Sequence, residues 1–351
     1  MLVGAPHPHE LVGTLTIDFF AHYIAEQPRA QSELGCSWHF IQVVEPDGVH
    51  LNEPWLRKAR RPSAYLHSFY RPPLHEQAEY TFPFSTRDRS FGMATPEANA
   101  WRTALDWVRP DLLVSLHNSE VGGAFFFSSG DDFELDSSLL ECAGWLGFDI
   151  DADGEPGSLA KAGRPGVFHF PDEIEQSILE AGATGAASPL RTGDSSAGYS
   201  QRQFGTLSLV PEVPYWRLRE GIRASVLASR PAADDLVDAL LPRIDRSACS
   251  AEAARLLRAL DHDFNMGMME APRLGGDVSQ ALVAIRRPAM LFNLATRLGQ
   301  RELVDALKPR FDAWCEALDN VLEPIPLVQL VRLQAAAAWL AALRVQARQA
   351  A

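Results

Sequence analysis

Met1-Leu2-Val3-Gly4-Ala5-Pro6-His7-Pro8-His9-Glu10-Leu11 is the stretch that decides the expected fold, because an apolar run enters it and a helix-periodic run leaves it. Residues 1–5 are predicted to form a short strand, and residues 11–27 a helix with apolar side chains at helical spacing. His7 and Glu10 then lie in the connecting loop and the first turn of the helix. A neutral imidazole and a carboxylate placed there can share one divalent ion, and zinc suits such a ligand set. The spacing is common by chance, so it gains weight only from the rest of the chain.

Composition narrows the class of protein. The chain has 351 residues, 46% of them hydrophobic, and a net charge of −13, which argues against a nucleic-acid partner. We noted no apolar run of about 20 residues and no signal peptide, so no membrane partner is expected. The cysteines are widely spaced without a C-x-x-C pair, which is typical of reduced thiols in a cytoplasmic protein. They are Cys36, Cys142, Cys249 and Cys315.

Strand and helix patterns alternate over the first part of the chain. Further strands are predicted at residues 40–44, 112–116, 124–127 and 206–210, and helices at 95–108 and 136–146. Thr95 is the expected N-cap of the first of these helices, with Pro96 at its first position. Glu45-Pro46-Asp47-Gly48 is predicted to be a turn, and residues 51–92 a long functional loop. The alternation predicts an α/β fold with a mainly parallel mixed sheet and flanking helices.

Acidic and histidine side chains follow several of these strands. His7 and Glu10 follow the first strand, His117 follows the strand at 112–116, and Glu212 follows the strand at 206–210. Sites in such sheets form beyond the carboxyl ends of the strands. These four side chains are therefore expected to converge at one edge.

The chain changes character after about residue 219. Leucine, alanine and arginine dominate there, and we found no strand pattern. Helices are predicted at 233–243, 250–261, 277–298, 301–319 and 326–348. We expect a catalytic domain at 1–219 and an all-α region at 220–351. Three roles are open for these helices: docking on the catalytic part, homo-oligomerisation, or a separate bundle.

Taken in order, these motifs resemble the zinc carboxypeptidase (metallocarboxypeptidase) family, as a divergent and N-terminally short member. His7-x-x-Glu10, His117 and Glu212 fall in the family's order. Other segments are similar to the family's motifs over about residues 1–216: Glu45-Pro46-Asp47-Gly48, Asn52 with Trp55 to Arg60, Phe82-Pro83, Thr95-Pro96-Glu97 with Asp111, and Tyr199 with Gly205. The chain begins at the ligand strand itself, so a start upstream of Met1 is also open.

The resemblance implies a role for each matching residue. His7, Glu10 and His117 would hold Zn²⁺, with His9 as the alternative to His7. Glu212 would act as the catalytic base. Arg57 would stabilise the oxyanion, and Arg71 is the alternative because the match is offset by one residue.

The substrate-binding residues depart from the family. The family's Asn-Arg pair, which grips a terminal carboxylate, falls at Glu79-Tyr80. A carboxylate there would repel such a substrate. Either another arginine binds it, with Arg71, Arg87, Arg89 and Arg191 as the candidates, or the substrate has no terminal carboxylate. Glu120 repeats the His-x-x-Glu spacing after His117 and is expected either in the pocket or as a loop-capping carboxylate.

Three functions follow from these observations. The first is a zinc hydrolase that cleaves an amide bond, releasing the C-terminal residue of a peptide. The second is a zinc amidohydrolase or deacylase acting on a small N-acyl or modified amino acid, which the missing Asn-Arg pair favours. The third is a non-catalytic binding protein.

Overall fold

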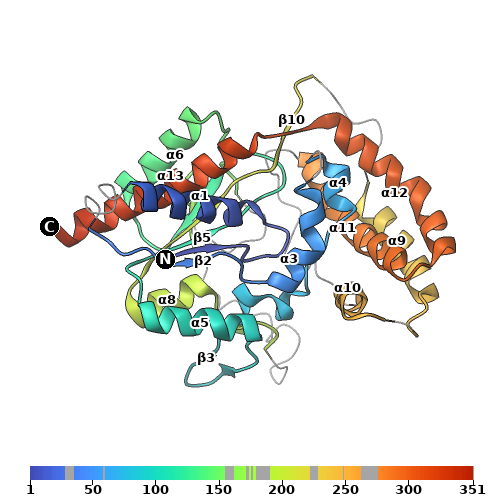
Figure 1. Cartoon of the computed structure of the whole chain (residues 1–351), viewed down its shortest axis with the longest axis horizontal. Helices are drawn as coiled ribbons and strands as arrows, with labels where there is room; N and C mark the ends of the chain where they lie inside the picture. The colour runs from blue at the N-terminus through green and yellow to red at the C-terminus, as the bar shows by residue number, and fades with distance from the viewer. Residues whose placement is uncertain are drawn as a thin grey trace.

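The architecture is that of a computed structural model, which describes residues 1–27, 35–57, 60–154, 162–170, 174, 177–178, 190–221, 228–247, 249–261 and 276–350. Figure 1 shows a central sheet with helices above and below it on the left, and a group of helices on the right. Both parts are formed by the described residues of one chain.

The centre of the fold is a sheet that has seven strands within the described residues, in the order β2-β1-β5-β9-β6-β8-β7. They are β1 (Leu2–Gly4), β2 (Phe40–Ile41), β5 (Leu112–Leu116), β6 (Phe125–Ser128), β7 (Ala162–Arg164), β8 (Val167–His169) and β9 (Leu207–Glu212). Neighbours from β2 to β9 are parallel. Strand β6 is antiparallel to β9 and parallel to β8, and β7 is antiparallel to β8. The predicted α/β class with a mainly parallel mixed sheet is confirmed.

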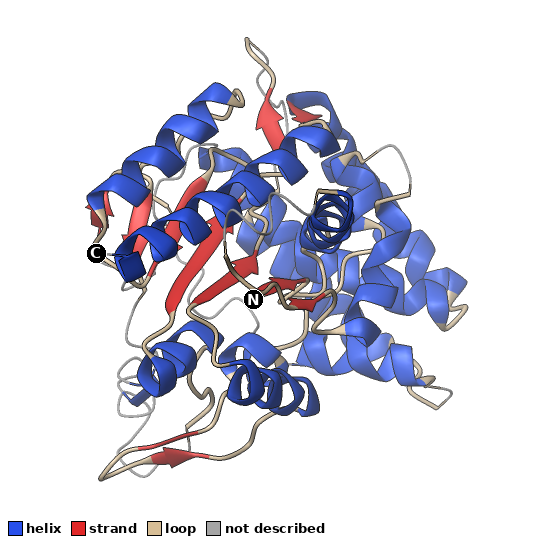
Figure 2. Cartoon of the chain, turned by 60° about the vertical axis from the view of Figure 1, so that its left-hand side comes forward, coloured by secondary structure: helices blue, strands red, loops and turns tan. Residues whose placement is uncertain are grey.

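Helices cover both faces of this sheet, as Figure 2 shows. They are α1 (Val12–Glu26), α5 (Pro96–Val108), α6 (Phe133–Trp145), α8 (Ser196–Phe204) and α13 (Leu327–Ala350). Leu2 and Val114 belong to the larger apolar core with α1, whereas Val3 and Leu113 belong to a smaller core with Trp101 of α5. Alternate strand residues therefore face opposite layers, the period of two expected of a sheet buried on both sides.

The start of α5 follows the sequence prediction. The Oγ1 atom of Thr95 accepts a hydrogen bond from the backbone nitrogen of Ala98 at 3.1 Å, and Pro96 is the first helical residue. The side chain thus satisfies one of the amide groups that has no partner inside the helix.

The segment after β2 differs from its prediction. Glu45-Pro46-Asp47-Gly48 was expected as a turn, but Pro46 begins a helix, α3 (Pro46–Asn52). The fixed φ of a proline at the first position and an acidic residue in the first turn both favour a helix start. The segment expected to be a long loop is also more regular than predicted. It contains 3₁₀ turns at Glu53–Trp55, Leu74–Glu76 and Ala78–Tyr80, the helix α4 (Pro62–Leu66), and the hairpin of β3 (Phe84–Ser85) and β4 (Ser90–Phe91).

The predicted helices of the C-terminal region are present, and one strand was missed. The region contains α9 (Arg230–Leu240), α10 (Ala251–Asp261), α11 (Gly276–Arg297), α12 (Arg301–Val321) and α13. Strand β11 (Leu322–Pro324) pairs antiparallel with β10 (Trp216–Leu218), so the expectation of no strand after residue 219 is wrong. Three residues are too short a run for a strand pattern to be visible in the sequence.

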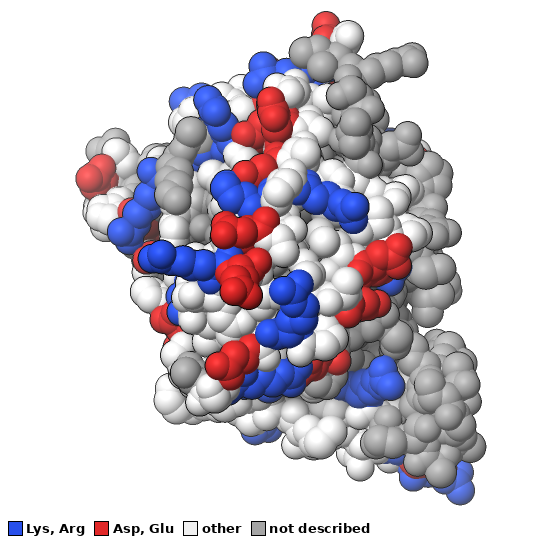
Figure 3. Space-filling model, turned by 90° about the vertical axis from the view of Figure 1, so that its right-hand side faces the viewer, with Lys and Arg blue, Asp and Glu red and all other residues white. Residues whose placement is uncertain are grey.

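Charges of both signs are interspersed on the face shown in Figure 3. In the helical region Arg246 pairs with Asp261 at 3.1 Å, and Arg258 pairs with Glu76 of the segment before β3 at 3.0 Å. The second of these pairs connects the helical region to the sheet-bearing part. The domain boundary at residue 219 stays a prediction.

Helix α13 leaves the helical region and packs across the sheet beside α1, where it contacts α6, β5 and β9 as well. It is the one helix in the described part of the chain that is long and apolar enough to cross a membrane, with a mean hydropathy of 1.2 over its best window. The expectation from the sequence that no apolar run approaches this length is therefore wrong for α13. A core helix of this kind meets the same criterion, and α13 buries Leu330, Leu333 and Gln334.

Candidate metal centre

Three side chains from two strand ends form a buried cluster that could hold a metal ion. His7 and Glu10 lie between β1 and α1, and His117 follows β5. One ligand atom from each lies within 4.8 Å of the others. Strands β1 and β5 are parallel neighbours with Gly4 opposite Leu116, so their carboxyl ends reach the same edge of the sheet. The predicted convergence of these side chains is confirmed.

The loop that carries His7 and Glu10 is held by a close approach of backbone segments. The backbone nitrogen of Glu10 donates to the carbonyl oxygen of His7 at 3.0 Å, which closes a tight turn. A Cβ atom on Gly4 would lie 2.9 Å from the backbone of Gly13, so only glycine fits where β1 meets α1. Ala5 has a φ of 46°, a conformation that is uncommon outside glycine and that often accompanies functional sites.

The protonation state of His7 suits a metal ligand. Burial lowers the pKa of His7 well below its usual value, and the nearby Arg71 guanidinium lowers it further. The imidazole is therefore neutral at physiological pH and keeps a lone pair for coordination. Its Nδ1 atom is buried and has no hydrogen-bond partner among the described residues. A metal ion is the kind of partner that this atom lacks, so the residues fit a bound metal.

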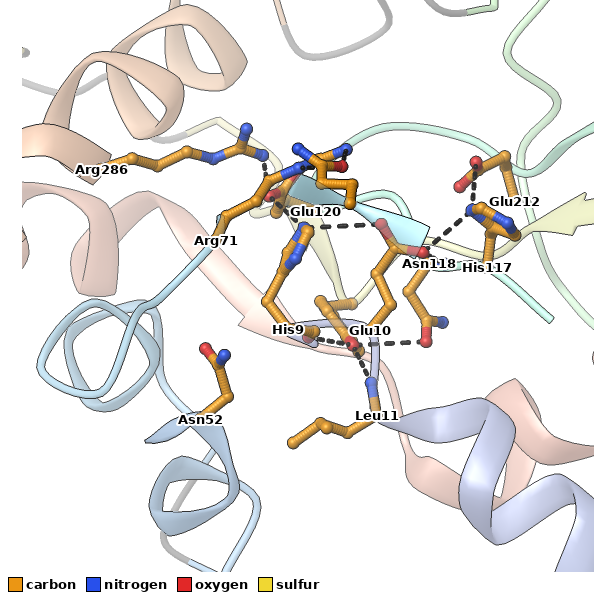
Figure 4. A network of polar contacts seen from close by, with 12 residues as sticks. His9, Glu10, Leu11, Asn52, Arg71, His117, Asn118, Glu120, Glu212 and Arg286 are labelled. Atoms are coloured by element: carbon orange, nitrogen blue, oxygen red, sulfur yellow. Dashed lines mark hydrogen bonds and ion pairs between the residues drawn. The ribbon is translucent and has the colours of Figure 1, made fainter. Parts of the chain in front are cut away.

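Glu212 lies at the edge of the same cluster. It ends β9, which is the parallel neighbour of β5. A bridge joins Glu212 to His117, and the Glu212 Oε1 atom is 3.5 Å from His117 Nδ1. Figure 4 shows both carboxylates, Glu10 and Glu212, directed at His117. A carboxylate here can reach a water molecule held at the cluster.

Glu120 takes a different role from Glu10, although each follows a histidine at the same spacing. Its Oε1 atom accepts a hydrogen bond from the Tyr65 hydroxyl at 2.9 Å and forms an ion pair with Arg286 of α11. Both ends of this ion pair are buried, which is tolerable only because each charge has its partner. Glu120 is therefore a buried carboxylate held by a cation rather than an exposed surface residue, and a role in binding substrate stays a prediction.

His9 connects Glu120 with the ligand Glu10. The His9 Nε2 atom lies 3.5 Å from Glu10 Oε1 and 3.9 Å from Glu120 Oε1, as Figure 4 shows. Burial, with a further contribution from Arg71, lowers the pKa of His9 well below its usual value. A neutral His9 placed between the two carboxylates can orient Glu10, as the partners of metal ligands do.

Two of the predicted substrate residues lie beside the cluster. The Tyr80 ring stacks on His7 with 5.5 Å between ring centroids. Arg71 donates two hydrogen bonds to Gln77 Oε1, at 3.0 and 3.3 Å, and lies close enough to act on the pKa of both His7 and His9.

The remaining two predicted residues lie apart from the triad. The Arg57 side chain is 78% exposed and pairs with Glu53 at 3.1 Å, so it does not reach the buried cluster. Glu79 is buried and accepts hydrogen bonds from the backbone nitrogen and hydroxyl of Ser196, at 3.0 and 2.7 Å, where α8 begins. A carboxylate at a helix N-terminus is favourably placed, and this explains an acidic residue at that position.

Sequence reasoning missed several groups that hold the site. Asn118 donates to the Val213 carbonyl at 2.9 Å, and Tyr215 donates to the His9 carbonyl at the same distance. Arg286 and Gln334 reach the site from the C-terminal helices. Asn118 and Tyr215 are close in the sequence to His117 and Glu212, which is a signal that could have pointed to them. Arg286 and Gln334 have no such signal.

Comparison with known proteins does not assign this chain to a family. No family model matches this sequence, and no curated protein matches it significantly. Two crystal structures match, both of proteins provisionally described as metallopeptidases, from Shewanella denitrificans OS217 and Shewanella amazonensis SB2B. They share 14% and 15% identity with this chain, and each match covers 61% of it. The matches cover 64% of the first protein's chain, which is less than two thirds, and 67% of the second. The TM-score is 0.39 for both, a likeness too weak to assign chemistry.

Proposed function

We propose that this protein is a zinc-dependent hydrolase of amide bonds, related in its chemistry to the carboxypeptidases. The observation that supports it is the meeting of His7, Glu10 and His117 with Glu212 at one edge of the sheet. Two imidazoles and one carboxylate suit zinc, and three protein ligands leave one position for water, as in catalytic sites. Bound zinc would supply Lewis-acid activation of that water at neutral pH.

The protein's own side chains account for the movement of protons and charge. Glu212 takes a proton from the attacking water and passes it to the leaving amine. Arg71 provides positive charge for the oxygen that becomes negative in the transition state. Neutral His9 stays beside Glu10 and keeps its orientation. These three roles use groups that lie next to the cluster, whereas Arg57 lies on the surface.

The substrate is proposed to be either a peptide that loses its C-terminal residue or a small N-acyl or modified amino acid. The second class is favoured by the residues Glu79 and Tyr80, which occupy the positions of the family's carboxylate-binding Asn-Arg pair. Glu79 is tied to Ser196, and the Tyr80 ring covers His7. Neither side chain can donate the bidentate pair of hydrogen bonds with which an arginine binds a terminal carboxylate.

The test combines one variant with three groups of substrates. The zinc-loaded protein is assayed with peptides that have a free C-terminus, the same peptides amidated, and N-acyl amino acids. We expect one group to be hydrolysed, and Glu212→Gln to keep its zinc while kcat falls by about 10²- to 10⁴-fold. Zinc binding without hydrolysis of any group would leave the non-catalytic binding protein as the better account.

A further inference from the structure

Helix α13 places one buried polar side chain at the metal centre, although it belongs to the C-terminal region outside the resemblance to carboxypeptidases. Gln334 is 0% exposed and is the only buried polar residue of α13, a helix that the structure describes in full. A buried amide is costly unless its hydrogen bonds are made. The hydrogen bonds that Gln334 makes therefore indicate its structural role.

Gln334 bridges the two segments that carry the three ligands. Its Nε2 atom donates to the carbonyl oxygen of His117 at 2.8 Å. Its Oε1 atom accepts from the Thr16 hydroxyl at 2.7 Å. Thr16 lies on α1, the helix that follows His7 and Glu10, so one amide group joins α1 to the end of β5.

The bond to His117 also acts on Glu10. The His117 carbonyl and the Asn118 backbone nitrogen belong to the same peptide unit, which is planar. That nitrogen donates to Glu10 Oε2 at 3.2 Å. The same carboxylate oxygen lies 3.0 Å from His117 Nδ1. Holding the carbonyl at one end of a rigid plane fixes the direction of the N–H group at the other end.

We propose that Gln334 is a positioning residue of the metal centre: it fixes the His117–Asn118 peptide plane, which orients Glu10 toward the ion that His117 shares. This rests on the proposed function only in that the triad binds a metal. The C-terminal helix is then part of the metal centre. Groups that orient metal ligands typically contribute 10- to 100-fold to affinity, so a similar effect is expected here.

The experiment compares a variant that removes the bond to His117 with one that keeps it. Gln334→Leu removes the bonds of Gln334 to His117 and Thr16, whereas Thr16→Val removes the bonds of Thr16 to Gln334 and Val12, keeps the bond to His117, and serves as the matched control. Zinc affinity is measured by chelator competition, and the Co²⁺-substituted proteins are compared by visible absorption. The midpoint of thermal unfolding is measured without metal. Should Gln334→Leu not fold, Gln334→Met takes its place.

We expect Gln334→Leu to lower zinc affinity by about 10- to 100-fold and to shift the Co²⁺ spectrum. We expect Thr16→Val to change affinity by less than about 3-fold, with a similar shift in thermal unfolding of the metal-free protein, since buried hydrogen bonds contribute comparably. Unchanged affinity and spectrum in Gln334→Leu would overturn the inference and leave the proposed function standing. A wild-type protein that binds zinc without hydrolysis would overturn the function, while the affinity comparison would still decide the inference. A wild-type protein without zinc would overturn both.

Discussion

The Oε2 atom of Glu10 lies 3.0 Å from Nδ1 of His117, in the interior of the protein and between the ends of two adjacent parallel strands. A buried carboxylate and imidazole this close share either a proton or a metal ion. His7 adds a neutral imidazole with an unsatisfied nitrogen to the same cluster. A third ligand of this kind has no use in a simple ion pair and favours the metal.

Substitution of Arg71 is expected to lower activity, whereas substitution of Arg57 is not. We expect Arg71→Met to lower kcat/KM by about 10²- to 10³-fold, the usual cost of removing a group that stabilises an oxyanion. Arg57→Met is the control, because that side chain lies on the surface with Glu53. Steady-state kinetics of the zinc-loaded proteins check this. A larger loss in Arg57→Met would restore the original assignment of Arg57.

Glu45 should make the stability of the fold depend on pH. Burial raises the pKa of its carboxyl from the ordinary value of 4.5 to about 8. Between these values the unfolded chain loses the proton and the folded chain keeps it, so stability falls as pH rises through this window, by up to about 1.4 kcal/mol per pH unit.

Glu45→Gln removes this titration and keeps an oxygen that can accept from the Ala78 backbone nitrogen, now at 2.9 Å. We expect the metal-free variant to gain stability relative to wild type between about pH 5 and pH 8. Urea unfolding at both pH values measures the difference. Equal pH dependence in the two proteins would show that Glu45 is ionised in the folded state.

Gly13 is expected to tolerate no side chain. A Cβ atom there would lie 2.8 Å from the Leu116 Cβ and 2.9 Å from the Leu116 carbonyl oxygen. We expect Gly13→Ala to cost about 1–3 kcal/mol by overpacking, and to weaken zinc binding because Leu116 precedes His117.

Gly144 in α6 is the matched control for Gly13, since an added Cβ meets nothing within 4 Å. Gly144→Ala should stabilise the protein by about 0.5–1 kcal/mol through helix propensity. Urea titrations of both variants measure the two free energies of unfolding. Equal effects of the two substitutions would contradict the close packing of α1 on β5.

The buried pair of Glu120 and Arg286 gives a double-mutant prediction. Arg286→Met leaves Glu120 buried without that partner, and we expect a loss of about 3–5 kcal/mol in stability. Arg286→Met combined with Glu120→Gln should recover most of this loss, because the uncompensated charge is gone. Denaturant unfolding of the wild type, both single variants and the double variant gives the coupling. Additive effects would show that the pair does not interact.

The parts of the fold that could be predicted are those with a local cause. Thr95 and Pro96 begin α5 because a cap and a proline act on their own turn. The meeting of His7, Glu10, His117 and Glu212 followed from their positions after buried strands, because the carboxyl ends of parallel strands share an edge. In both cases the residue pattern in the sequence was sufficient for the prediction.

The parts that could not be predicted depend on distant contacts or on a choice between similar local structures. Arg286 and Gln334 lie on helices whose sequences look like ordinary core helices, and only the folded chain brings them to Glu120 and His117. Glu45-Pro46-Asp47-Gly48 can begin a helix or form a turn. The sequence match left open whether Arg57 or Arg71 would stabilise the oxyanion. Arg57 is exposed and Arg71 lies near the buried cluster, which is information that the sequence does not contain.

Metal content tests the central claim most directly. The purified protein is incubated with zinc, freed of excess by gel filtration, and analysed by mass spectrometry of the metal together with its His117→Ala variant. We predict close to one zinc per chain for the wild type and a large loss for the variant, with little change in the circular dichroism of the metal-free proteins. A wild-type protein that retains no zinc, or a His117→Ala variant that retains it with equal affinity, would contradict the assignment of His7, Glu10 and His117 as a metal centre.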